Sequence, residues 1–147
     1  MEFLSFAHSL LRYLLLLAVA FAGITHLLGW LRNTPILNGE RSAAILAMVL
    51  CHVQLVVGIV MYIVYAKHTA DASDPAGRYW KFEHATMMLV VIALVTLGRS
   101  LSKRAKEERL KQRHVAVFYL IALMLMLVTI PWPGSHFGDV TGITSWL

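Results

Sequence analysis

Residues 3–31 read FLSFAHSLLRYLLLLAVAFAGITHLLGWL, an apolar run that only a few ionisable side chains interrupt. A helix of about 20 apolar residues is long enough to cross the roughly 30 Å hydrocarbon core of a bilayer. Three further apolar runs, at 43–66, 82–101 and 115–130, have the same character. The sequence therefore predicts an all-α integral membrane protein, an antiparallel four-helix transmembrane bundle that forms a single domain over residues 1–147.

The composition supports this class and limits the available chemistry. Hydrophobic residues make up 59% of the chain and charged residues 14%, and the connections between the runs are too short for a soluble domain. We expect the first run to be a retained helix, because a signal peptide starts with basic residues whereas this chain starts Met1-Glu2 and carries Arg12 within the run. Cys51 is the only cysteine, so any metal centre must rest on histidine and methionine.

The basic residues are spread unevenly along the chain and predict its orientation. The loops after the first and third runs, together with Arg99 at the end of the third run, carry nine of the 13 Lys and Arg residues, whereas the second loop mixes basic with acidic side chains. The positive-inside rule then places both termini on the outer, periplasmic side, with Trp80 and Trp132 as anchors at that interface. The net charge of +5 is thus a topology signal, and no aromatic or glycine pattern accompanies it to indicate nucleic-acid binding.

Two histidines lie at matched depth in this arrangement. His8 is a few residues into the first run and His84 a few residues into the third, both counted from the outer side. The first and third helices of an up-down-up-down bundle sit on a diagonal, so level side chains that point inward converge. Ionisable groups at membrane depth are costly unless they face a cavity, a partner or a bound group. The pair therefore predicts axial ligation of one haem iron from two sides.

Three further polar residues are candidates for the same site. Arg12 lies one helical turn from His8, on the same face, and is expected to pair with a haem propionate or with Glu83. Glu83 is also placed to orient the imidazole of its neighbour His84 or to pass a proton. His52 lies near the middle of the second run. We interpret it as a polar-core residue, and as an alternative haem ligand if the helices tilt or shift.

Gln54, Gly58 and the methionines have simpler interpretations. Gln54 is interpreted as a residue that hydrogen-bonds between helices, and Gly58 as a packing notch. Met87 and Met88 follow His84 by about one helical turn, so a histidine–methionine site for copper or haem can be drawn. Methionine is also ordinary filler in apolar bundles, and that interpretation is favoured.

The four remaining histidines are weaker candidates. His26 and His114 are expected near the cytoplasmic boundary, where imidazoles commonly snorkel into water, so a second haem or metal between them is not favoured. His68 and His136 lie in predicted outer segments and are interpreted as structural.

Four short motifs carry a resemblance to a known family. They are His8-Ser9-Leu10-Leu11-Arg12-Tyr13, His52-Val53-Gln54 with Gly58, Glu83-His84 with Met87-Met88, and Ile130-Pro131-Trp132-Pro133. Together they resemble the small four-span membrane proteins of bacteria known as cytochrome b, over nearly the whole chain. The resemblance implies a haem b in the bacterial inner membrane. The positions that match its pattern are His8, Arg12, His52, Glu83 and His84.

Two functional hypotheses remain open at this point. In the first, the protein is a haem-b electron carrier or a membrane subunit of a quinol-linked redox complex, rather than a stand-alone enzyme. Its partners would be the lipid bilayer, a quinone or quinol, and other respiratory or redox subunits. In the second, a cofactor-free four-helix membrane protein uses buried histidines for metal binding, transport or proton relay. The sequence contains no nucleophile triad, phosphate loop or pair of catalytic carboxylates, so hydrolytic and phosphoryl-transfer chemistry is unsupported.

Overall fold

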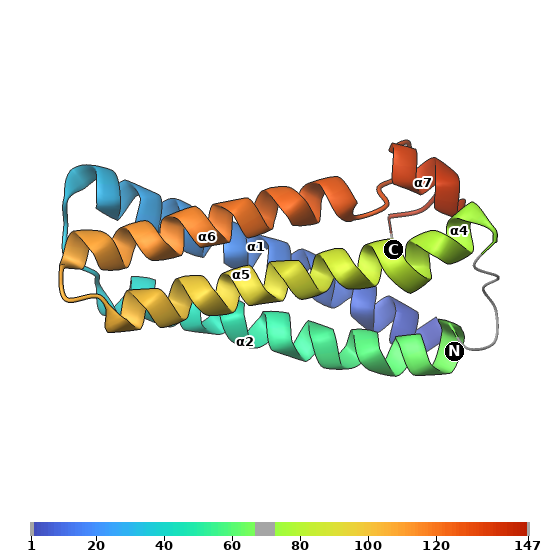
Figure 1. Cartoon of the computed structure of the whole chain (residues 1–147), viewed down its shortest axis with the longest axis horizontal. Coiled ribbons are helices and arrows are strands. Elements are labelled where there is room, and N and C mark those ends of the chain that lie inside the picture. Colours follow the sequence, from blue (N-terminus) through green and yellow to red (C-terminus); the bar gives the residue numbers. More distant parts are fainter. Residues whose placement is uncertain (1, 67–72, 147) are drawn as a thin grey trace.

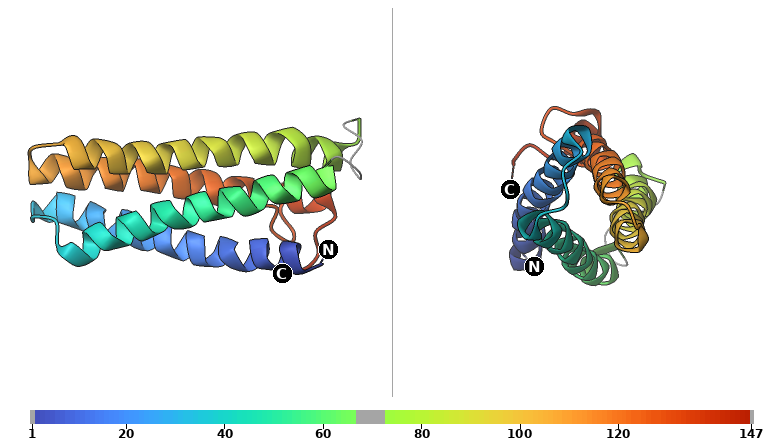
Figure 2. Two further views of the ribbon diagram at one scale, coloured as in Figure 1. Left: turned by 90° about the horizontal axis from the view of Figure 1, so that it is seen from below. Right: turned by 90° about the vertical axis from the view of Figure 1, so that its left-hand side faces the viewer.

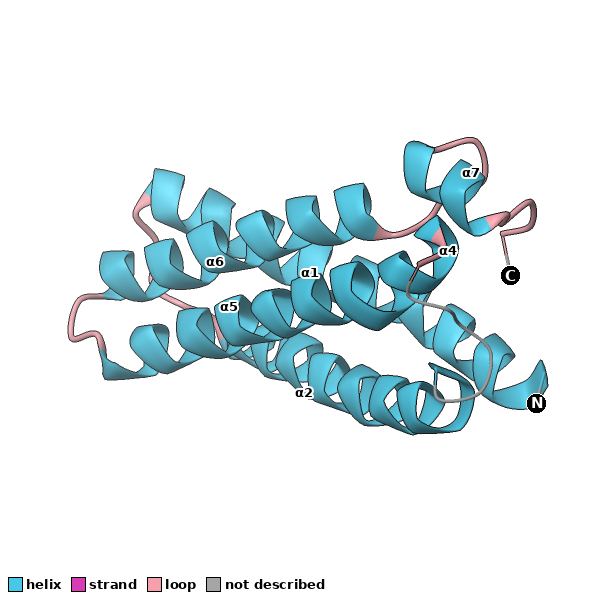
Figure 3. Ribbon diagram, turned by 45° about the vertical axis from the view of Figure 1, so that its right-hand side comes forward, coloured by secondary structure: helices cyan, strands magenta, loops and turns pink. Residues whose placement is uncertain are grey.

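A computed structural model describes residues 2–66 and 73–146, and every regular element in these ranges is helical (Figure 1). Four long helices make up most of the molecule: α1 (Glu2–Arg32), α2 (Asn38–Met61), α5 (His84–Arg104) and α6 (Glu108–Thr129). Four short elements complete it: η1 (Tyr62–Ala66), α4 (Pro75–Arg78), η2 (Tyr79–Glu83) and α7 (His136–Thr141). Within the described ranges, short loops separate the helices (Figure 3).

Four helical segments are long and apolar enough to cross a membrane, as the sequence predicts. They span Phe3–Arg32, Asn38–Val64, Pro75–Arg104 and Glu108–Thr129. The third begins earlier than the predicted 82–101, because α4, η2 and α5 follow one another without a break. The fourth begins earlier than 115, because its charged first turns belong to the same helix as the apolar run. The apolar runs thus mark the parts of the helices that are suited to hydrocarbon, and the third and fourth helical segments begin before these runs.

The long helices form a four-sided bundle in which α1 packs on α2 and α6, and α5 packs on the same two helices. The end-on view shows α1 and α5 facing each other across the bundle (Figure 2). Both chain termini lie at one end with α4 and α7, and the connections after α1 and α5 lie at the other (Figure 1). We call these the terminal end and the basic end.

The bundle interior is built from small and branched side chains. Val19, Ala22, Ala47, Val95 and Ala122 are fully buried, which lets the helix backbones approach closely, as is common between transmembrane helices. The large apolar side chains instead point outward along all four helices. Such a surface would promote aggregation in water, whereas hydrocarbon solvates it. The distribution is therefore that of a protein whose outer solvent is lipid.

Candidate functional site

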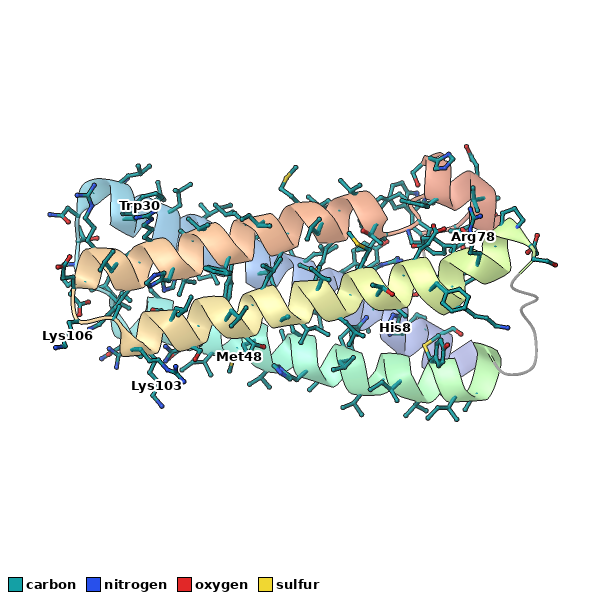
Figure 4. The ribbon with its side chains drawn as sticks, in the orientation of Figure 1. His8, Trp30, Met48, Arg78, Lys103 and Lys106 are labelled. Carbon is teal, nitrogen blue, oxygen red and sulfur yellow. The ribbon has the colours of Figure 1, made fainter. Side chains whose placement is uncertain are left out.

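The structure brings His8 and His84 together inside the terminal end. His8 lies on α1 and His84 is the first residue of α5, so the two side chains come from helices that face each other across the bundle (Figures 2 and 4). Their ring centres are 6.4 Å apart, and the ring planes are inclined at 67°. Both residues are partly buried. Two imidazoles that are far apart in the chain thus form one cluster.

The hydroxyl of Tyr79 lies beside one ring nitrogen of His84. The Tyr79 side chain is fully buried, and its hydroxyl donates a 2.5 Å hydrogen bond to the carbonyl oxygen of Thr129. The hydroxyl has only one proton, which it donates to Thr129 O. The Tyr79 oxygen can therefore act only as an acceptor for His84 Nδ1, which lies 3.5 Å away. The contact favours the tautomer of His84 with the proton on Nδ1. Nε2 then carries the lone pair that a metal ion requires.

Tyr79 leaves no recognisable signal in the amino-acid sequence, and the reason is the local helix geometry. Tyr79 and His84 are five residues apart, which places them on different faces of an α-helix with about 3.6 residues per turn. However, residues 79–83 form the π-helical segment η2, whose wider turn brings positions five apart into register. Short π-helical segments occur often at functional sites. The α-helical period therefore gave no signal for this contact.

Aromatic rings form an apolar wall beside His84. The Trp80 ring centre lies 5.5 Å from that of His84, and Tyr79 packs against Trp80 at 4.9 Å. On its other side Tyr79 contacts Phe137 of α7 at 5.1 Å, so the short C-terminal helix closes this part of the bundle. The imidazole of His84 therefore lies among the rings of His8, Tyr79 and Trp80.

His8 has a different set of neighbours on α2. Gln54 Nε2 donates a 2.9 Å hydrogen bond to the backbone oxygen of His8, which confirms the interhelical role predicted for Gln54. A Cβ atom at Gly58 would lie 3.6 Å from Cε1 of His8, which is an ordinary contact distance. Glycine at this position therefore leaves space beside the ring. His8 Nδ1 is buried and has no hydrogen-bond partner within the described part of the chain.

Arg12 is at the same end but has an unexpected partner. Its Nη2 donates to the backbone oxygen of Trp146 at 2.8 Å and to the Tyr13 hydroxyl at 3.1 Å. The guanidinium also lies over the rings of Tyr13 and Trp132, 4.7 and 5.4 Å from their centres. Its Nε is buried and unpaired among the described residues. Arg12 thus fastens the C-terminal segment to α1 and keeps one buried donor free.

The predicted pairing of Arg12 with Glu83 is not observed. Glu83 Oε1 instead accepts a 3.1 Å bond from Arg78 Nε, and both side chains are substantially exposed. The cause is again η2, which brings position 78 into register with position 83 five residues later. Glu83 therefore forms a surface ion pair with Arg78, and this ion pair does not involve the His8–His84 cluster.

His52 also differs from its expected place in the polar core. It is exposed on α2, and its Nδ1 lies 2.7 Å from the backbone oxygen of Met48 in the preceding turn. The core face of α2 is formed by Ala44, Ala47 and Cys51. Because successive residues turn by about 100° around an α-helix, the residue after Cys51 points out of the bundle. The structure therefore separates His52 from the His8–His84 cluster.

The other histidines lie outside this cluster. His26 is only 1% exposed, with Nδ1 2.8 Å from Ala22 O, so the expectation that it snorkels into water is wrong. His114 Nδ1 is likewise buried and has no partner within the described ranges. His136 is exposed on α7, and His68 lies outside the described residues. Met88 packs against the apolar core, as expected for methionine filler.

The two predicted tryptophan anchors have different roles in the structure. Trp80 is 37% exposed at the terminal end, a position suited to an interfacial ring. Trp132 is instead held within the protein. Its Nε1 donates to Leu127 O at 2.8 Å, and its ring packs on Tyr13 and Trp146. The Trp132 ring also supports the guanidinium of Arg12, which lies over it.

Comparisons with protein-family models, with curated proteins and with solved structures give no match to this chain. The resemblance to cytochrome b proteins therefore stays a hypothesis that rests on the motifs. Within the described ranges, no three His, Cys, Asp or Glu side chains are grouped so that they could hold a metal ion. The chemistry of the terminal end thus rests on two facing imidazoles, their aromatic wall and one arginine.

Proposed function

We propose that this protein is a membrane-embedded b-type cytochrome that binds one haem b through His8 and His84 and carries electrons. The facing imidazole pair is the observation that supports it. A metal–imidazole bond is about 2.0–2.1 Å long, so two imidazoles on one iron place their ring centres roughly 6 Å apart. The observed separation is 6.4 Å. Two axial ligands are sufficient for haem, because its ring supplies the other four nitrogens.

The surrounding residues fit such a ligand pair. The Tyr79 contact favours the His84 tautomer that leaves Nε2 free, and the hydroxyl of Tyr79 donates in turn to Thr129 O. Trp80 and Tyr79 supply apolar surface, and Gly58 leaves space on the opposite side beside His8. Arg12 supplies the cationic group, and its unpaired Nε is a donor suited to a propionate. When bound, haem supplies a one-electron iron couple, which these apolar surroundings shield from water.

The same proposal includes the finer topology. We propose an antiparallel transmembrane bundle in the bacterial inner membrane, with both termini outside and a quinone or a redox subunit as electron partner. The shared position of the termini at one end supports it (Figure 1), as does the concentration of basic residues in the loops at the other end. A periplasm-specific reporter fused after Leu147 is expected to be active. Activity of a cytoplasm-specific reporter there would contradict the topology.

The haem proposal is tested by the absorption spectrum of the intact protein purified in mild detergent, before and after haemin is added. We expect a Soret band, a sharp α band on reduction with dithionite, and one haem per chain. His8→Ala and His84→Ala are expected to remove the bound haem, whereas His52→Ala and His136→Ala are matched controls at exposed positions. Folded protein that shows no spectrum of bound haem after haemin is added would contradict the proposal and favour the cofactor-free alternative.

A further inference from the structure

The basic end of the bundle contains a cavity of about 190 Å³ to which all four long helices contribute. A single water needs only about 10–15 Å³ by this kind of measure, so the space is large enough for a small polyatomic group. The polar side chains that line it are His26, Arg41, Arg99, Ser102, Lys103 and Lys111. Lys103 marks this end in Figure 4, far from His8. The cavity is therefore separate from the proposed haem site.

The cations around the cavity exceed the carboxylates that neutralise them. Lys111 is paired with Glu108, whose other oxygen accepts a 3.0 Å bond from Ile36 N. Arg41, Arg99 and Lys103 have no carboxylate within ion-pair distance in the part of the chain that the structure describes. Three cations thus line one cavity without an ion-pair partner among the described residues.

The one nearby carboxylate of α2 is already committed to other donors. Glu40 Oε2 accepts from Leu37 N at 2.9 Å and from Gln112 Nε2 at 3.2 Å. Glu40 is not among the residues that line the cavity. It stabilises the start of α2 and the packing of α6, and leaves the three cations of the cavity unpaired.

His26 adds a buried polar atom to the cavity wall. The residue is 1% exposed, and its Nδ1 is taken up by the Ala22 carbonyl at 2.8 Å. Because Nδ1 donates its proton to Ala22 O, Nε2 of the neutral ring is an acceptor, and it bonds a phosphate only through a proton carried by the ring or by the phosphate. Ser102, which is 2% exposed, contributes a hydroxyl to the same wall.

We propose that this cavity binds the phosphate group of an anionic ligand. Arginine and lysine form charge-assisted hydrogen bonds with phosphate oxygens, and a single phosphate matches three unpaired cations better than a neutral ligand would. Basic pockets between transmembrane helices on the cytoplasmic side are suited to anionic lipid head groups. A soluble phosphate compound offers the same chemistry. The site does not depend on the proposed haem.

The test measures binding to the full chain in detergent by isothermal titration, with two probes that separate the sources. The soluble probe is pyrophosphate, and the lipid probe is short-chain phosphatidylglycerol, with short-chain phosphatidylcholine as its zwitterionic control. We expect saturable binding of at least one anionic probe at one site per chain, and none of phosphatidylcholine. Binding of phosphatidylglycerol alone assigns a lipid head group, and binding of pyrophosphate assigns a site open to soluble anions.

Matched variants separate the cavity from general surface charge. Arg99→Gln is expected to weaken binding about tenfold or more, because a hydrogen bond to a charged group is lost. Lys103→Gln, at an exposed position, tests the same site without disturbing the interior. Arg104→Gln removes the same charge from the end of α5 outside the cavity and should leave affinity unchanged. The proposal is wrong if no anionic probe binds the wild type, or if Lys103→Gln and Arg104→Gln have equal effects.

Discussion

The two ends of the bundle each enclose a buried histidine, but they surround it differently. At the terminal end, His84 faces a second imidazole and aromatic rings, and the nearby cations Arg12 and Arg78 are engaged with a carbonyl and a carboxylate. At the basic end, His26 shares a cavity with three unpaired cations. The comparison shows that the neighbours of a buried imidazole decide its chemistry. We therefore propose a haem at one end and an anion at the other.

The largest effect should come from removing either imidazole of the terminal end. His8→Ala or His84→Ala is expected to abolish stoichiometric haem binding, because only one of the two imidazoles that would hold the iron then remains. His26→Ala removes a buried imidazole from the basic end and should retain full haem content. Haem per chain, measured as the pyridine haemochrome, checks both results. Loss of haem in His26→Ala with retention in His84→Ala would reverse the assignment of the two ends.

Tyr79→Phe should have the next largest effect. It removes the hydroxyl that contacts His84 Nδ1 and Thr129 O, and partners that orient a metal ligand typically contribute about 10- to 100-fold to affinity. We expect haem affinity to fall by about tenfold or more and the midpoint potential to shift, as measured by haemin titration and redox titration.

Tyr119→Phe is the matched control for that substitution. Tyr119 is also fully buried, and its hydroxyl donates a 2.7 Å bond to Ala44 O on α2. Both variants should lose stability of about 0.5–1.5 kcal/mol, because each loses one buried hydrogen bond to a carbonyl oxygen. Only Tyr79→Phe should move the potential. Equal potentials in the two variants would show that Tyr79 is purely structural.

Arg12→Lys should produce a smaller change. A lysine retains the charge but cannot reproduce the planar fork that contacts Trp146 O and Tyr13. We expect a few-fold weaker retention of haem, with the spectrum of the bound fraction unchanged, as measured by haem loss to apomyoglobin. Arg78→Lys, on the exposed pair with Glu83, is the control. Identical loss rates in the wild type and Arg12→Lys would exclude the arginine from the site.

Glu83→Gln should have the smallest effect. Its ion pair with Arg78 is exposed, and such pairs contribute about 0–1 kcal/mol to stability. Haem content, midpoint potential and thermal stability should therefore match those of the wild type within error. A marked change in potential would show that Glu83 acts on the site in a way that its observed contact does not explain.

The sequence was sufficient to predict the architecture and part of the site. Apolar run length predicts the four long helices, and equal depth on the first and third runs predicts the approach of His8 and His84. These inferences depend on regular α-helical geometry. The predicted partner of Glu83 was wrong, and Tyr79 was not predicted. Both residues lie in the π-helical segment η2, where the α-helical period no longer applies.

Other misplacements have different physical causes. The exposure of His52 follows from which face of α2 packs inward, and hydropathy cannot decide this when apolar residues surround the whole helix. The burial of His26 and the cavity beside it depend on side chains from all four helices meeting at one end. Such a convergence of segments far apart in the chain leaves no local pattern in the sequence.

We propose that His8 and His84 together hold one haem at the terminal end. Electron paramagnetic resonance of the oxidised wild-type protein, purified intact with its haem, tests it most directly. We expect a single low-spin ferric signal typical of two imidazole ligands, which His84→Ala does not give because it no longer holds the haem. A high-spin signal, a spectrum typical of methionine ligation, or an unchanged low-spin signal in His84→Ala would contradict it.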